Sequence, residues 1–165
     1  MRLLRRRRVP AAVRESLRRE RGERVITYAV TRDGRYVVAT GRALYLPGDV
    51  RLPWEQVHQA TWHGGWLYVQ ETSTLDARGG EHHLRLDDPG RLPEAVRERV
   101  SATILVNQYA RLTGDHGVRV VARRSPTGTE TTWTLVFDAE LDPHDPALRT
   151  AAGQVLEEIR RQTGV

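Results

Sequence analysis

Aromatic and imidazole side chains are concentrated in one short segment, residues 51–69, which reads RLPWEQVHQATWHGGWLYV. Imidazole ligates transition metals and transfers protons near neutral pH, so these residue types allow a metal centre or an acid–base site. Indole and phenol rings allow a third reading, in which the rings fill a core or form a contact surface. Spacing decides between these readings, because reactive side chains must converge on one point.

The histidine spacing does not favour a metal site. His82 and His83 are consecutive on an expected strand, so they point to opposite faces of its sheet. His58 and His63 lie near opposite ends of another expected strand, and the other two histidines fall in expected loops. We therefore expect no metal and no other cofactor. A metal hydrolase built on His58, His82 and nearby acids is kept as a third hypothesis.

Other catalytic arrangements are also missing from the sequence. The chain has no Cys and no Lys, which excludes thiolate chemistry, Schiff bases and the lysine-dependent phosphate loop. There is no Gly-x-Ser-x-Gly elbow and no glycine-rich dinucleotide turn. The acids and histidine of LDPHDP, residues 141–146, are typical of a helix N-terminus. We expect a protein that is not an enzyme and has no small-molecule substrate.

The elements that would position these residues are mostly strands. Short strand signals at residues 24–31, 36–40, 43–46, 55–63, 66–72 and 81–87 are separated by Gly, Pro and Asp turns, and the first of them alternates. Residues 50–52 make a seventh strand if they count as a short one. Leu92, Val96 and Val100 recur every four residues, and with Pro93 near the start they predict a helix at 93–100. Before the strands, residues 10–19 predict a short amphipathic helix.

A second group of elements follows. Strands are expected at residues 102–112, 118–124 and 131–138, and a last helix is expected with Asp145 as N-cap and Pro146 as first residue. The predicted class is therefore α+β, mostly β: six or seven antiparallel strands with a short helix, then a three-stranded antiparallel sheet and a C-terminal helix. We divide the chain into residues 1–23, a basic tail and short helix, 24–101, a β domain, and 102–165, a β-β-β-α extension packed on it.

Residues 34–69 resemble bacterial pleckstrin-homology-like domains, which commonly have Ala-Thr-x-Arg between two strands and then Ile/Leu-Pro-Trp/Leu-Glu-x-Ile/Val before a hairpin. The matching residues are Ala39, Thr40, Arg42, Leu44, Leu52, Pro53, Trp54, Glu55 and Val57. The whole chain also resembles a group of proteins of high-GC bacteria that carry this domain with a β-rich extension. The resemblance implies a strongly bent sheet or split barrel, with a helix closing one end.

Lipid binding is the best-known activity that this resemblance implies. Eukaryotic members bind phosphoinositide headgroups with basic residues of the first hairpin, which here would be Arg32 and Arg35. Val37 stands where a further basic residue is expected, and Asp33 lowers the local charge. Many members of the fold bind proteins instead, so the fold alone does not determine the ligand.

The rings of the opening segment fit a scaffold better than a reactive site. Gly64 and Gly65 suit a tight hairpin, and alternation then places Leu67 and Val69 inside the sheet. Trp66 and Tyr68 lie on the opposite, outer face, where they are candidates for contact with a partner.

Positive charge is concentrated at the N-terminus. Ten Arg and three Glu among residues 1–24 give +7, whereas the remaining chain carries −2. Arg5, Arg6, Arg7 and Arg8 are four consecutive cations that would attract an anionic membrane surface or, non-specifically, nucleic acid. A solubilising, unstructured tail is the alternative. No base-reading helix accompanies the tail, so we expect no specific nucleic acid.

The function predicted from the sequence is a non-catalytic binding module that contacts a protein partner or itself. The alternative is peripheral association with anionic lipid through the N-terminal arginines. We expect a cytoplasmic protein, which in the alternative would lie at the inner face of the membrane.

Overall fold

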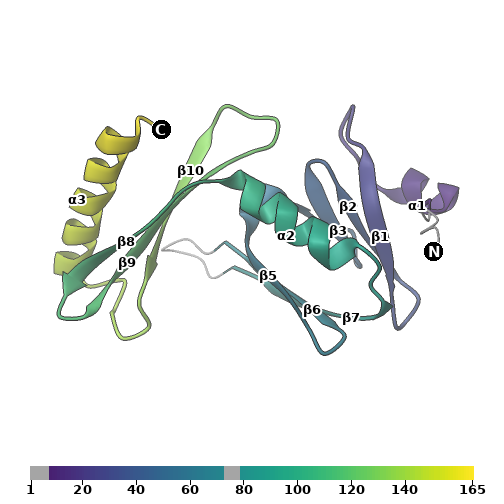
Figure 1. Cartoon of the computed structure of the whole chain (residues 1–165), viewed down its shortest axis with the longest axis horizontal. Helices are drawn as coiled ribbons and strands as arrows, with labels where there is room; N and C mark the ends of the chain where they lie inside the picture. Colours follow the sequence, from purple (N-terminus) through teal and green to yellow (C-terminus); the bar gives the residue numbers. More distant parts are fainter. Residues whose placement is uncertain (1–7, 73–78) are drawn as a thin grey trace, which may run out of the picture.

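The computed structural model describes residues 8–72 and 79–165, and its largest element is a seven-stranded antiparallel sheet (Figure 1). The strand order is β4-β3-β2-β1-β7-β6-β5. Its strands are β1 (Val25–Thr31), β2 (Tyr36–Thr40), β3 (Ala43–Leu46), β4 (Val50–Pro53), β5 (Val57–His63), β6 (Trp66–Glu71) and β7 (Glu81–Asp88). The predicted class, α+β and mostly β, is confirmed. The sheet is open, and the described strands form no closed barrel.

The sheet bends where its two halves meet. β1 and β7 pair through only two residue pairs, with a register shift between them. Helix α2 (Leu92–Thr103) lies across the opening and packs on β5, β1 and the 3₁₀ turn η1 (Trp54–Gln56). Its predicted stripe of Leu92, Val96 and Val100 is buried in the main core. The helix runs to Thr103, beyond the predicted end, and the Thr103 hydroxyl donates to the carbonyl of Val100.

The N-terminal segment covers the outer face of β2 and β3. Helix α1 (Ala11–Ser16) is shorter than predicted, but Val9, Val13 and Leu17 still share one side and pack on Val38 and Tyr45. The opposite side of the same two strands faces the main core. Strands β2 and β3 are therefore buried on both faces, which explains why YVVAT and ALYL are apolar without alternation.

A buried carboxylate fastens this cover to the sheet. Glu23 accepts hydrogen bonds from the Thr40 hydroxyl (2.5 Å), the Tyr45 hydroxyl (3.1 Å) and the Glu20 N–H (2.8 Å), and lies 3.4 Å from the Arg51 guanidinium. Burial raises the pKa of Glu23, but these hydrogen bonds and Arg51 outweigh burial and hold the pKa below its ordinary value.

The rest of the chain forms a second antiparallel sheet with strand order β10-β9-β8. Its strands are β8 (Ile104–Thr113), β9 (His116–Arg124) and β10 (Thr131–Phe137), and helix α3 (Pro146–Thr163) packs on one face (Figure 1). Asp145 caps α3 as predicted, accepting from the N–H groups of Ala147 and Leu148. None of the helices described is both long and apolar enough to span a bilayer.

Arg123 of β9 joins the two sheets. Its side chain is buried and donates to the carbonyl of Val100 (3.3 Å) and the hydroxyl of Thr103 (2.9 Å) at the end of α2. It also donates to the carbonyl of His58 on β5 at 2.9 Å. Burial lowers the pKa of Arg123. The guanidinium is held by carbonyl and hydroxyl oxygens, and the C-terminal end of the α2 dipole favours a cation there.

We expect Glu23→Gln to destabilise the protein at pH 7 by about 1–3 kcal/mol, since the amide weakens charge-assisted hydrogen bonds. The folded-state pKa is lower than the unfolded one, so the carboxylate stabilises the fold above the ordinary Glu value of about 4.3. This contribution is lost as the pH falls from there through the folded-state pKa. Urea unfolding at neutral and acidic pH measures the difference.

The exposed Glu15 of α1 is the matched control, and Glu15→Gln should change the free energy of unfolding little at any pH. A wild-type advantage over Glu23→Gln that persists unchanged into strong acid would contradict the role given to the carboxylate.

Candidate binding surface on strands β5 to β7

The outer face of β5, β6 and β7 carries three cross-strand rows of polar and aromatic residues, here called the β5–β7 outer surface. Strand alternation produces it: Leu67 and Val69 of β6 are buried, whereas Trp66 and Tyr68 are 38% and 39% exposed. The rows, read from β5 to β7, are His63, Trp66 and Arg85; Thr61, Tyr68 and His83; and Gln59, Gln70 and Glu81.

The first row is organised around the hairpin turn. Gly64 and Gly65 both have positive φ, 58° and 82°, as a two-residue hairpin of this kind requires. The Arg85 guanidinium donates to the carbonyl of Gly64 at 2.6 Å and lies 5.8 Å from the centroid of the Trp66 ring. Arg85 therefore ties the turn to β7 and supports the exposed indole by a cation–π contact.

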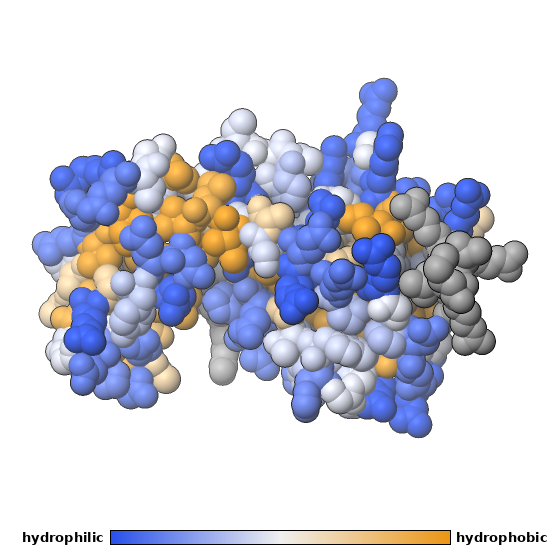
Figure 2. Space-filling view, in the orientation of Figure 1, coloured by the Kyte–Doolittle hydropathy of each residue, from blue (hydrophilic) through white to orange (hydrophobic). Residues whose placement is uncertain are grey.

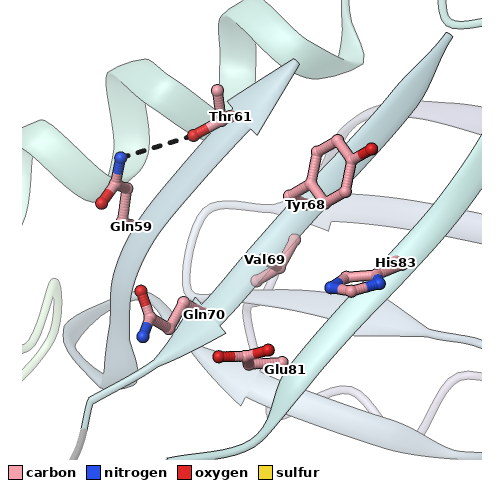
Figure 3. A pocket seen from close by; sticks show the side chains of 7 residues that line it. All are labelled: Gln59, Thr61, Tyr68, Val69, Gln70, Glu81 and His83. Atoms are coloured by element: carbon pink, nitrogen blue, oxygen red, sulfur yellow. Dashed lines mark hydrogen bonds between the residues drawn. The ribbon is translucent and has the colours of Figure 1, made fainter. Parts of the chain in front are cut away.

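The second and third rows form a shallow polar hollow (Figure 3). Tyr68 and His83 meet edge to face with ring centroids 5.0 Å apart, and the Gln59 amide donates to the Thr61 hydroxyl at 3.4 Å. Val69, Gln70 and Glu81 complete the lining. The hollow thus offers amide, hydroxyl, imidazole and carboxylate groups beside the phenol ring of Tyr68, a set suited to hydrogen bonding and stacking.

His82, named in the hydrolase hypothesis, and its neighbour His83 make separate contacts. His82 bonds Glu71 at 2.7 Å, whereas its neighbour His83 contacts Tyr68 on the outer surface. Burial, with a smaller effect from the Arg123 charge, lowers the pKa of His58. Within residues 8–72 and 79–165, no three His, Asp or Glu side chains are grouped so that they could hold a metal ion.

The arginine candidates have different surroundings. Arg35 on the first hairpin forms an ion pair with Asp33 at 2.6 Å, so part of its charge is already compensated. Arg32 and Arg8 are exposed. Arg5, Arg6 and Arg7 lie outside the described residues.

Sequence reasoning located Trp66 and Tyr68 on the outer face but missed the residues around them. The register of three strands places Arg85, His83, Gln59 and Gln70 beside the two rings, and no single segment of the sequence gives this register. The available signal was the period of two in EHHLRLD, which sets Glu81, His83 and Arg85 on the face opposite Leu84 and Leu86.

Comparison of the chain with protein-family models, with curated proteins and with solved structures gives no match in any of the three.

The two faces of β6 should respond differently to truncation. Leu67→Ala should lower the free energy of unfolding by about 2–5 kcal/mol, because it opens a cavity in the main core. Tyr68→Ala, one residue along, should cost about 1 kcal/mol or less, since the ring is exposed. Urea unfolding of the two variants makes the comparison, and equal losses would show that Tyr68 has a structural role.

Proposed function

We propose that this protein is a non-catalytic binding module that contacts a protein partner through the β5–β7 outer surface. The observation that carries the proposal is the pair of exposed rings, Trp66 and Tyr68, at alternate positions of the middle strand. Polar side chains of β5 and β7 flank these rings on both sides.

This arrangement has the chemistry of a protein contact. Aromatic residues and Arg are enriched at the centres of such interfaces, and a polar rim supplies directed hydrogen bonds. Tyr68 is held by His83 and Trp66 by Arg85, so the rings lose little conformational freedom when a partner binds.

The charge of the surface separates this proposal from the lipid alternative. Arg85 and Glu81 have opposite charges, so attraction to a partner would depend mainly on rings and neutral polar groups. Binding should therefore change little with salt, whereas lipid binding through arginines should weaken as salt screens the charges. The ion pair between Arg35 and Asp33 also reduces the charge that the first hairpin offers to lipid.

A phage-displayed library of random peptides supplies a defined probe of this surface. The wild-type protein should select peptides whose affinity falls about tenfold or more in the Trp66→Ala/Tyr68→Ala double variant, as expected for hot-spot residues. Ile26→Ala is the matched control, since Ile26 is 44% exposed on β1 and lies outside the surface. Fluorescence anisotropy of the selected peptides measures both variants.

Vesicles containing anionic lipid give the opposing result. Lipid association predicts salt-sensitive co-sedimentation that is unchanged in the double variant and lost on removing residues 1–8. This result, together with selected peptides that bind the double variant as well as they bind the wild type, would overturn the proposal.

A further inference from the structure

The described strands leave four sheet edges, and three of them carry features that discourage pairing with another chain. Strand β4 has four residues that include Arg51 and Pro53. Strand β5 has a register shift and is covered by α2. Strand β8 has two register shifts and contains Arg111. Short length, charge, proline and bulges are the usual protections of an edge strand.

Strand β10 lacks these protections. It reads TTWTLVF, with no charge and no proline, and pairs with β9 through seven consecutive residues without a shift. Asp138, the next residue, donates its N–H to the carbonyl of Gly117 at 3.0 Å. Hydrogen-bonded pairs alternate along an antiparallel ladder. The even-numbered residues of β10 therefore face β9, and the odd-numbered ones direct their N–H and C=O groups to the outer edge.

The odd-numbered side chains are also incompletely covered. Trp133, Leu135 and Phe137 belong to the apolar cluster under α3, yet each is only half-buried, as are Val155 and Leu156 of the helix. Figure 2 shows the result as an apolar patch in the area between α3 and β10. An unpaired backbone edge and an apolar patch thus lie side by side.

We propose that β10 pairs antiparallel with β10 of a second copy of this chain, about a two-fold axis at Leu135. Leu135 then faces the partner's Leu135, and Trp133 faces the partner's Phe137, so the apolar patches join. The outward hydrogen-bonding groups of both strands are paired. The product is a six-stranded sheet with two helices on one face, and a two-fold interface of this kind needs only one self-complementary surface.

Charge at the two ends of β10 supports a second copy as the occupant. Arg124 of β9 pairs with Thr131 at the start of β10. The Arg160 guanidinium lies near the same end, 5.2 Å from the centroid of the Trp133 ring. Asp138 and Glu140 follow the other end of the strand. At the basic end Arg160 is already paired with Glu157 at 2.9 Å, and Glu130 precedes the strand. The exposed Arg124 is therefore the cation that antiparallel pairing brings towards the partner's Asp138 and Glu140.

Sedimentation velocity of the full chain tests the pairing. The mass should rise with concentration from the monomer value of 18.8 kDa towards twice that value. Leu135→Glu places two like charges at the axis and should weaken self-association tenfold or more. Leu105→Glu, at an exposed residue of edge strand β8, should leave it unchanged.

Leu135 also contributes to the cluster under α3, so a charge at this position could destabilise the fold itself. A second variant therefore tests the pairing without introducing a charge. The chain has no cysteine, so Leu135→Cys introduces a single thiol. Opposed residues of an antiparallel pair are close enough for a disulfide. Mild oxidation should yield covalent dimers with Leu135→Cys and far fewer with Leu105→Cys.

Three outcomes would overturn the inference. The protein could be a monomer at every concentration, or the two cysteine variants could cross-link equally. In the third outcome the protein stays monomeric and the β10 edge binds an extended peptide in a Leu135-dependent manner. The inference is independent of the proposed function, since the Trp66→Ala/Tyr68→Ala variant should still dimerise. Loss of peptide binding with the dimer intact would count against the β5–β7 outer surface alone. Loss of the dimer with peptide binding intact would count against the β10 edge alone.

Discussion

Burial of β2 and β3 on both faces is the constraint on which the rest of the structure depends. Their inner face packs in the main core, and their outer face needs the N-terminal segment with Val9, Val13 and Leu17. Glu23 holds that segment in place through Thr40, whose carbonyl also accepts the indole N–H of Trp54. One polar cluster thus connects the cover, the β2–β3 turn and the 3₁₀ turn that leads into β5, and so positions the sheet that carries the exposed rings.

Most of the fold could be predicted from local patterns. Short β-rich stretches between turn residues located the strands, four-residue spacing located α2, and the Asp145-Pro146 pair located the start of α3, because these signals depend on neighbouring residues. The exact end of α2 could not be predicted, since Thr103 stays helical through contacts with Val100 and Arg123. The domain boundaries and the resemblance to pleckstrin-homology-like domains stay predictions.

The candidate surface was predictable only in part. The period of two gave the direction of Trp66 and Tyr68. Their neighbours depend on the register of β6 with β5, which the Gly64-Gly65 turn sets, and on its register with β7, which no local pattern gives. Arg123 shows the same limit: VRVVARR suggests exposed arginines, and only the placement of α2 and β5 makes this one a buried link.

The two proposed surfaces have a combined consequence, because they lie on different sheets that are held together firmly. Helix α2 ends at Thr103 and β8 begins at Ile104, so no loop separates them, and Arg123 bridges the same junction. A dimer joined through β10 would leave both β5–β7 outer surfaces open and hold them at a set separation. Two linked sites can raise the apparent affinity for a repeated partner by roughly 10²–10⁴. This gain requires a partner whose contact points match that separation, so pairing through β10 would favour repetitive or dimeric partners over single ones.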